Sequence, residues 1–308
     1  GGLRGGEAVR ARGGLLALAA LALAAGCGRE PPDSRGLRQV SDGTGERVRV
    51  PAKPARIVSC SLASDEILLA LVGTERLAAV TALAADPARS SAAEEAKRVP
   101  RQISSLAAEA ETLLALKPDL VVISPYNTPE AVEVLRRAGA PIFRLAPLDS
   151  LEGIRKNVRL LGEAAGEPEG AARILAEFEA LLALARPPKG ARTPSVLAVS
   201  TDGWVFGPKT IPDDLLAAAG ARNAARESGP AAGGLESIHA ADPDVILILA
   251  TLDEPLPAAS HPAWKALRAV REGRAIRLPS RETLSASQHA AEGCERIAEA
   301  IRKAVAGP

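Results

Sequence analysis

The sequence predicts an α/β protein with two lobes, each built on a parallel sheet, bridged by one long α-helix. Apolar runs alternate with helix-like segments, and the runs are continuous, as in strands buried on both faces. A short phrase, ETLLALKPDLVVI from Glu111, returns as ESIHAADPDVILI from Glu236. Between the two halves lies a helical segment from Glu167 to Arg186. The repeat predicts two related lobes, and the segment between them predicts their connection.

Length and composition agree with two lobes. The chain has 308 residues, which is enough for two separate cores. Hydrophobic residues make up 47% and aromatic residues only 2%, so the cores must be built from Ala, Leu, Val and Ile. The formal net charge is +1, from 38 basic and 37 acidic residues. Proteins that bind nucleic acid normally carry a basic excess, so no nucleic-acid partner is expected.

The first 27 residues are expected to be an export signal. Three arginines precede the apolar run Leu15–Ala25, which has 11 residues. A bilayer span needs about 20, so the run is typical of a signal peptide. Cys27 follows LAAG, which resembles the bacterial lipobox, in which this cysteine is lipidated. We expect a membrane-anchored lipoprotein in the periplasm or on the cell surface; ordinary cleavage and a secreted protein are the alternative.

The rest of the chain divides into four parts. Residues 28–45 are rich in Pro, Gly and charge and predict a flexible tether. Residues 46–150 form the expected N-terminal lobe, and residues 191–308 the C-terminal lobe. The connecting segment, residues 151–190, contains the expected bridging helix at about residues 167–186. At about 1.5 Å per residue such a helix is about 30 Å long, the height of a domain, and it resists hinge bending.

The repeated phrase has the same plan in both halves. A glutamate stands seven residues before a proline, and an aspartate and an aliphatic strand follow the proline. We expect Glu111 and Glu236 in the first turn of a short helix, where the helix dipole favours a carboxylate by about 0.3–1 kcal/mol. Helix capping alone explains each glutamate taken singly.

Open α/β sheets bind ligands at the carboxyl ends of their strands. The expected loops at these ends hold the candidate ligand-contacting residues Ser61, Ser64, Tyr126, Asn127, Trp204, Phe206, Lys209, Arg281, Ser285 and Gln288. Tyr126 and Trp204 are the strongest candidates, because a polar loop is not where a core-filling ring is expected. The alternative is that each ring covers the end of a lobe core.

Other chemistries have little support. His239, His261 and His289 are widely spread, without metal-ligand spacing, so no metal site is expected. Phosphate loops and the HExxH, CxxC and GxSxG motifs are absent from the sequence, so neither a cofactor nor catalysis is expected. A hydrolase assembled from distant Ser, His and Asp residues remains an alternative. Cys60 and Cys294 are expected to be unpaired, although an exported protein permits a disulfide.

Residues 40 to 305 resemble the periplasmic-binding family of ABC importers for ferric siderophores and cobalamin. The resemblance rests on five segments in this order: PARIVSCSLASDEILLALVGTERLAAVT, LLALKPDLVVIS, GPKTIPDDLLAAAGARNAA, DPDVILIL and HPAWKALRAVREGRAIRLP. It implies two α/β lobes bridged by one helix, with the ligand in the cleft between them. It also implies an ABC permease dimer with its ATPase as partner, and no catalysis.

The resemblance assigns further roles. A glutamate at the tip of each lobe docks on permease arginines in this family, and Glu111 and Glu236 match those positions. The implied ligand is a ferric siderophore or a corrinoid. Corrinoid receptors tend to line the cleft with aromatic rings, whereas Leu83 and Glu282 stand here. Haem, with Tyr126 as its axial ligand, is an alternative. So are an envelope module for signalling or scaffolding without transport, and an extracytoplasmic enzyme.

Overall fold

The computed structural model describes most of the chain beyond its N-terminus. The described ranges are 36–104, 106–232, 235–251 and 262–306, without the side chains of residues 106–108 and 235–237. They all belong to one compact unit, Pro32–Pro308. The expected signal peptide, its lipidation site Cys27 and the start of the expected tether lie outside the described residues.

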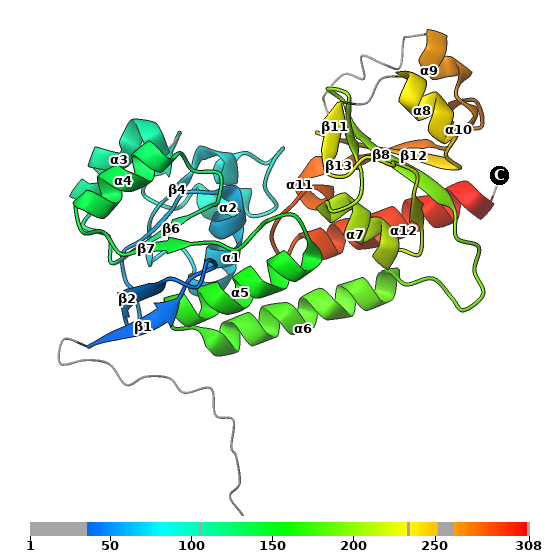
Figure 1. The fold of residues 1–308 in the computed structure, drawn as a ribbon. Coiled ribbons are helices and arrows are strands. Elements are labelled where there is room, and N and C mark those ends of the chain that lie inside the picture. Colours follow the sequence, from blue (N-terminus) through cyan, green and yellow to red (C-terminus); the bar gives the residue numbers. More distant parts are fainter. Residues whose placement is uncertain (1–35, 105, 233–234, 252–261, 307–308) are drawn as a thin grey trace, which may run out of the picture. The chain divides into compact units, whose positions relative to one another are not determined.

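The N-terminal lobe contains a five-stranded sheet in the order β5-β4-β3-β6-β7, with every pair parallel (Figure 1). Its strands are β3 (Ile57–Ser59), β4 (Leu77–Thr81), β5 (Gln102–Ile103), β6 (Leu120–Ile123) and β7 (Ile142–Arg144). The helices that connect them are α1 (Leu62–Val72), the 3-10 helix η1 (Ala82–Ala85), α2 (Ala93–Ala96), α3 (Leu106–Ala115) and α4 (Pro129–Arg137).

The C-terminal lobe contains a six-stranded sheet in the order β11-β9-β8-β12-β13, with β10 beside β8. Its strands are β8 (Ser195–Ser200), β9 (Trp204–Phe206), β10 (Arg222–Asn223), β11 (Pro230–Ala232), β12 (Val245–Ala250) and β13 (Ala275–Pro279). Its helices are α7 (Ile211–Ala218), α8 (Leu235–Ala241), α9 (Pro262–Ala266), α10 (Arg268–Arg271), α11 (Ser280–Thr283) and α12 (Ala290–Ala306).

The central strands are buried on both faces, as their continuous apolar sequence predicts. In β6, Leu120 and Val122 belong to one hydrophobic cluster, and Val121 and Ile123 belong to another. Strand β12 divides its residues between two clusters in the same alternating way. In the N-terminal lobe, α3 and α4 cover the face of the sheet that is turned away from α6 (Figure 1). The two-lobe α/β prediction is confirmed.

The C-terminal sheet differs from the prediction at one edge. The segment TDGWVFGPKT, expected to be a polar loop, contains strand β9, which pairs antiparallel with β8 and β11. A tight turn makes this possible, because the backbone N–H of Gly203 donates to the carbonyl of Ser200 and Gly203 has φ +92°. The sheet is therefore mixed, with a parallel centre and an antiparallel edge.

Two long helices, α5 (Leu151–Ala165) and α6 (Pro168–Ala185), lie between the lobes in sequence. Gly166 separates them with φ +74°, and a Cβ there would lie 2.3 Å from the carbonyl oxygen of Ala52. Glycine is therefore required at this turn. The segment expected to form one bridging helix at residues 167–186 is α6, and it packs side by side with α5 and α12 (Figure 1).

One hydrophobic cluster extends through both lobes by way of α6. It contains residues of α1 and β6 from the N-terminal lobe, of α7, α12 and β12 from the C-terminal lobe, and of α5 and α6. Phe178 of α6, at 1% exposed, is among the largest fully buried side chains. Arg155 of α5 lies over its ring at 5.6 Å and pairs with Glu179. The bridging helix is therefore part of the core of both lobes.

The repeated phrase has the same structure in both lobes. Lys117 and Asp242, the residues before the two prolines, both have positive φ, 50° and 34°. The aspartates after the prolines accept hydrogen bonds from the N-terminal end of the neighbouring strand. Asp119 accepts from Ala55 N and Arg56 N at 2.8 and 2.9 Å, and Asp244 accepts from Ser195 N at 2.9 Å. Each aspartate therefore ties the start of the central strand to that of its neighbour.

The expected tether ends earlier than predicted. Strand β1 (Leu37–Ser41) lies within it and pairs antiparallel with β2 (Arg47–Pro51). Val40 and Val48 are buried in the core, and Asp42 accepts hydrogen bonds from the backbone of the turn that follows. The tether prediction is wrong over residues 37–45, because Val40 supplies apolar surface to the N-terminal lobe and β1 pairs with β2.

Both described cysteines, Cys60 and Cys294, are free and buried. Burial raises the pKa of both thiols, that of Cys294 to about 12, so they are poorly reactive. In the part of the chain that the structure describes, no helix combines the length and apolar character needed to cross a membrane.

Truncating Phe178 tests the shared core. We expect Phe178→Ala to lower the free energy of unfolding by about 3–5 kcal/mol, because it leaves a cavity where α6 joins the two lobes. Urea denaturation followed by circular dichroism measures the change. Leu184 lies on the same helix but is 65% exposed, so Leu184→Ala is the control, with a change within about 0.5 kcal/mol. Equal effects of the two variants would contradict a shared core.

Candidate functional site

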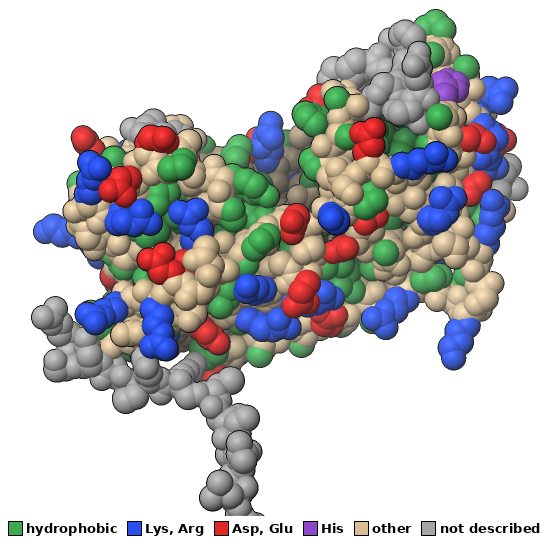
Figure 2. All heavy atoms as spheres, in the orientation of Figure 1, with side chains coloured by type: hydrophobic (Ala, Val, Ile, Leu, Met, Phe, Trp, Pro, Cys, Tyr) green, Lys and Arg blue, Asp and Glu red, His purple; other side chains and the backbone are tan. Residues whose placement is uncertain are grey.

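A cleft of about 360 Å³ opens between the two lobes. Loops at the carboxyl ends of strands form it: those after β3, β4, β6 and β7 on one side and after β13 on the other. Its lining residues are Ser61, Leu62, Ala63, Leu83, Arg89, Ser124, Tyr126, Leu148, Ser280, Arg281, Leu284, Ser285 and Ala286. Figure 2 shows the surface hollowed between the lobes. The place and size are those of a small-molecule site in an open α/β fold.

The lining combines an apolar surface with two cations and one phenol. Four leucines supply most of the apolar surface: Leu62, Leu83, Leu148 and Leu284. Arg89 and Arg281 supply positive charge from opposite lobes, and none of the described residues that line the cleft is Asp or Glu. Tyr126 is 74% exposed, which leaves its ring and hydroxyl open to a ligand. Such a surface suits a large, partly apolar, anionic molecule.

The loop after β6 is shaped to present Tyr126. Asn127 Oδ1 accepts a hydrogen bond from Ser124 N at 2.7 Å, and Ser124 Oγ accepts one from Tyr126 N at 3.2 Å. Asn127 Nδ2 donates to the carbonyl of Cys60 at 3.3 Å, which ties the loop to the end of β3. The phenol is therefore carried by a hydrogen-bonded turn.

Arg281 spans the cleft. Its Nη1 donates to the carbonyl of Pro87 in the N-terminal lobe at 3.1 Å, and its Nε donates to Glu282 at 3.4 Å. Arg89, on the opposite wall, pairs with Asp86 at 3.6 Å. Arg89 and Asp86 are both exposed, so their pair is weak and an anionic ligand can compete for the guanidinium. Glu282 is buried, but the Arg281 side chain is 34% exposed, which leaves part of its guanidinium open to a ligand.

The expected cleft residues fall into three groups. Ser61, Tyr126, Arg281 and Ser285 line the cleft. Ser64, Asn127 and Gln288 lie behind the lining: Ser64 Oγ is bonded to Ser59 and Ser61, and Gln288 Nε2 donates to the carbonyl of Glu66. The third group, around β9, is separate from the lining: Trp204 is 43% exposed, Phe206 packs against the core, and Lys209 N donates to Asp213.

Sequence reasoning missed several lining residues. Arg89 lies in the loop after η1, and Leu148 lies in the loop after β7. Leu83, which was expected at the cleft from the family resemblance, lies in η1 and lines the cleft. The signal that points to them is position, because each follows the carboxyl end of a strand in the parallel sheet. Leucines in such loops look like ordinary core residues in the sequence. Only their 47% exposure, in the case of Leu83, marks them as surface.

The two expected docking glutamates lie on α3 and α8, each on the side of its sheet turned away from α6 (Figure 1). Glu111 is exposed, but its expected place in the first turn is wrong, because α3 begins five residues earlier, at Leu106. Glu109 is the first-turn acid, and it accepts from Ser104 N and pairs with Arg101, both at 2.8 Å. Glu236 is in the first turn of α8, and its side chain lies outside the described residues.

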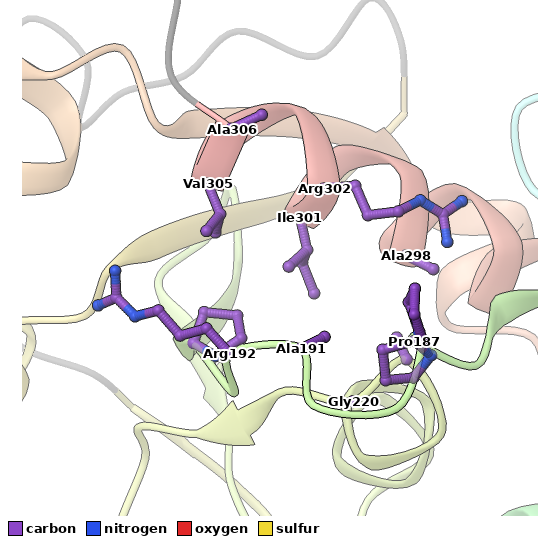
Figure 3. A pocket seen from close by; sticks show the side chains of 12 residues that line it. Pro187, Ala191, Arg192, Gly220, Ala298, Ile301, Arg302, Val305 and Ala306 are labelled. Carbon is purple, nitrogen blue, oxygen red and sulfur yellow. The ribbon is translucent and has the colours of Figure 1, made fainter.

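A second hollow, of about 240 Å³, lies at the end of α12. Figure 3 shows Ile301 and Val305 of α12 facing Pro187 and Ala191 of the segment after α6. The cations at its rim, among them Arg192, extend away from its centre. It lacks an aromatic ring and an inward-facing polar group, so the cleft between the lobes is the better candidate.

Metal-binding side chains do not gather in the described part of the chain. No group of three or more His, Cys, Asp or Glu side chains there is arranged to hold a metal ion. Among the described residues that line the cleft, Tyr126 offers its hydroxyl as a metal-ligating group.

One buried carboxyl lies directly behind the cleft. Asp65, in the first turn of α1, is fully buried; its Oδ2 accepts from Thr81 N and Thr81 Oγ1, and its Oδ1 has no hydrogen-bond partner. Burial raises the pKa of the Asp65 carboxyl to about 8, and the hydrogen bonds from Thr81 offset part of this. Asp65 is therefore mostly protonated at neutral pH.

Residues 57–282 match the periplasmic binding protein family. Among curated proteins, the uncharacterized ABC transporter substrate-binding lipoprotein YvrC of Bacillus subtilis (strain 168) is 25% identical, over 93% of this chain and 95% of its own. The vitamin B12-binding protein of Vibrio campbellii is 31% identical, over 41% of this chain and 44% of its own. Among solved structures, the periplasmic heme-binding protein RhuT from Roseiflexus sp. RS-1, in apo form, is 30% identical, with a TM-score of 0.66 over 81% of this chain and 98% of that one.

The carboxyl of Asp65 predicts a pH-dependent stability. Its folded pKa lies above the ordinary value of 3.8, so the folded protein holds this proton where the unfolded chain releases it. The contribution to stability is complete below about pH 4 and is lost as pH rises to about 8. Asp65→Asn, which stays neutral, should abolish this part of the pH dependence and stabilise the protein at pH 8 by about 1 kcal/mol or more.

Urea denaturation at several pH values from 4 to 9 measures the free energy of unfolding of wild type and of Asp65→Asn. The difference between the two free energies separates the contribution of Asp65 from that of other titrating groups. A constant difference across this range would show that Asp65 is ionised in the folded protein.

Proposed function

The chain belongs to the periplasmic binding protein family, and from that premise we propose that its cleft binds haem and delivers it to the permease of an ABC importer. As a member of this family it is an extracytoplasmic substrate-binding protein of an ABC transporter, and it is not an enzyme. The haem assignment rests on the side chains of the cleft. It takes up haem, the alternative ligand in the sequence analysis, in place of the ferric siderophore or corrinoid that the family resemblance implies.

The observation that carries the proposal is the exposed phenol of Tyr126. A side chain of this size is 74% exposed on the wall of a cleft, at the tip of a turn whose polar groups are hydrogen-bonded. Phenol oxygen is a hard ligand that suits ferric iron, and tyrosine is one of the residues that hold haem iron in proteins. Tyr126 is therefore the proposed axial ligand.

The other residues that line the cleft suit the porphyrin ring and the carboxylates of haem. Leu62, Leu83, Leu148 and Leu284 offer apolar surface to the flat porphyrin, at about 25 cal/mol for each Å² of apolar area buried. Arg89 and Arg281 are placed to receive its two carboxylates, and an arginine fork binds a carboxylate in a bidentate way. The similarity to the heme-binding protein RhuT, over most of both chains, supports the same ligand class.

A corrinoid is the second candidate. The vitamin B12-binding relative, although matched over less than half of each chain, supports it. A corrinoid carries amides where haem carries carboxylates, so it would make less use of the two arginines. Its cobalt also has no need of a phenol ligand. The cleft's charge and its exposed tyrosine therefore favour haem.

A titration with hemin tests the assignment. We expect saturable 1:1 binding, with a visible spectrum typical of iron bound to a phenolate. Tyr126→Phe keeps the ring but removes the ligand oxygen, so it should weaken binding by about tenfold or more, equivalent to about 1.4 kcal/mol, and change the spectrum. Trp204→Phe, at an exposed ring outside the cleft lining, is the control and should leave both unchanged.

Parallel titrations with cyanocobalamin and with ferric siderophores separate the ligand classes. Tight binding of cyanocobalamin without binding of hemin would replace haem by a corrinoid. Tight binding of a siderophore alone would return the assignment to a non-haem iron chelate. Binding of hemin with the same spectrum in Tyr126→Phe would keep haem and remove the axial ligand.

Membrane attachment through a lipid on Cys27 belongs to the same proposal. The lipobox-like LAAGC of the sequence supports it, as does the lipoprotein relative YvrC, which matches over nearly its whole length. Attachment would keep the receptor close to the permease, which raises its effective concentration there.

The matched helices α3 and α8 form the proposed contact with the permease. Each begins the repeated phrase of its own lobe, and both lie on the side of the sheets turned away from α6 (Figure 1). Glu111 is exposed on α3, and Glu236 holds the equivalent place before the second proline. Two carboxylates on two joined lobes suit a pair of arginines related by the two-fold symmetry of a permease dimer. First-turn capping does not explain Glu111, since it lies mid-helix.

Charge reversal tests the docking pair. The double variant Glu111→Arg with Glu236→Arg should lower ligand uptake, and the ATPase stimulation of the reconstituted importer, by about tenfold or more, since both charge pairs become repulsive. Ligand affinity should stay within about twofold, because the helices lie outside the cleft lining. Glu177→Arg, at an exposed position on α6, is the matched control. Normal uptake by the double variant would favour a binding module that acts without transport.

A further inference from the structure

Directly behind the cleft, a buried carboxylate joins the two lobes. Glu66 of α1 is 1% exposed and belongs to the N-terminal lobe. Its Oε2 accepts hydrogen bonds from Ser285 Oγ at 3.1 Å and from Ser287 Oγ at 2.6 Å, both in the C-terminal lobe. Gln288 Nε2 of the same segment donates to the carbonyl of Glu66 at 3.1 Å. One residue thus receives three polar groups from the opposite lobe.

The other carboxylate oxygen is held within its own lobe. Oε1 of Glu66 accepts from Ser90 Oγ at 2.8 Å and from Ser91 N at 3.1 Å. These two donors lie in the loop after η1 that also carries Arg89 of the cleft. The carboxylate therefore fixes a loop of each lobe at the same point.

The serine hydroxyls are oriented toward Glu66. Ser287 N donates to Ser285 Oγ at 3.1 Å, and His289 N donates to Ser287 Oγ at 3.3 Å. The two hydroxyl oxygens also lie 2.8 Å apart. Each hydroxyl has a single hydrogen, so a hydrogen that is directed to Glu66 is not donated to the other serine. Ser285 and Ser287 are themselves buried, so separation of the lobes would leave several polar groups without partners until water entered.

We infer that Glu66 is a positioning residue that holds the two lobes at one separation before any ligand arrives. Ser285, which it anchors, is part of the cleft wall, and the loop after η1, which it also anchors, carries the opposite wall. The width of the cleft is therefore set in the ligand-free protein. Ligand binding then needs little ordering of the lobes, and this preorganisation favours affinity. The inference holds whichever ligand the cleft binds.

Amide hydrogen exchange of the ligand-free protein tests it. The hydrogen-bonded contact of Glu66 with Ser90, Ser91, Ser285 and Ser287 is called the seam below. Glu66→Ala should speed exchange at Ser91, Ser287 and His289 by about tenfold or more, because the seam that protects these amides opens. Asp65→Asn is the matched control: Asp65 is the adjacent buried carboxyl of α1, and its hydrogen-bond partners lie in the N-terminal lobe. Exchange at the three amides should be unchanged in this control.

Glu66→Gln provides the conservative rescue. Its Oε1 accepts from Ser90 and Ser91, and its Nε2 donates to the two serine hydroxyls, which rotate to accept. Exchange at the seam should then stay within about threefold of wild type. Glu66→Leu is the control for volume. Its side chain has a similar volume but forms no hydrogen bond, so its exchange should resemble that of Glu66→Ala.

A second route avoids a variant that fails to fold. Ser285→Ala with Ser287→Ala removes the contacts from the other lobe and should also speed exchange at Ser91 and His289. Wild-type exchange in this double variant, or in a folded Glu66→Ala, would overturn the inference.

Affinity for hemin gives an independent readout. If Glu66→Ala reduces the fraction of molecules with a closed seam to about a tenth, hemin should bind about tenfold more weakly, and Glu66→Gln should bind nearly as wild type does. Unchanged hemin affinity in a Glu66→Ala protein with fast seam exchange would show that the seam does not position the cleft. Failure of the wild type to bind hemin would overturn the proposed ligand and leave the exchange result standing.

Discussion

Burial of both faces of two parallel sheets is the constraint on which the rest of this structure depends. A strand such as β6 or β12, with every residue apolar, must be covered above and below. On one face, each sheet has its own small cluster of residues. On the other face, α5, α6 and α12 form one layer that both sheets share, and the cluster there is continuous through Phe178. The two lobes consequently share one core, and the shared helices restrain movement of one lobe relative to the other.

The cleft follows from this arrangement. Parallel strands all end at the same edge of a sheet. Because α6 is part of the core of both lobes, it fixes the separation between the carboxyl-end edges of the two sheets. The loops at these edges are free to carry function because the helices beneath them carry the stability. Tyr126 and Arg89 are two such loop residues, and Arg281 lies in the short helix α11 directly after β13. Glu66 adds a polar link just below them, so the walls are joined both by packing and by hydrogen bonds.

The internal repeat has a clear structural part. The aspartate after each proline accepts backbone hydrogen bonds from the neighbouring strand, and this explains why Asp119 and Asp244 recur. The positive φ of Lys117 and Asp242 turns the chain from helix to strand. Those features account for the second half of the phrase. Glu111, which opens the first copy of the phrase, is exposed in the middle of a helix. An external partner accounts for it better than capping does.

The sequence by itself determined the fold class, the two-lobe division and the bridging helix. Continuous apolar runs, helix periodicity and the Pro–Asp pairs between helix and strand are local properties of the chain. It also determined that the candidate site lies in loops after strands, and it named Tyr126 and Arg281. Tertiary structure decided the rest. It showed that β9 forms an antiparallel edge, that residues 37–45 pack on the N-terminal lobe, and that Arg89 and Arg281 line the cleft from opposite lobes. It also brought Glu66 to Ser285 and Ser287, 219 and 221 residues away. Such contacts depend on how distant segments pack in space, and no local pattern of residues encodes that.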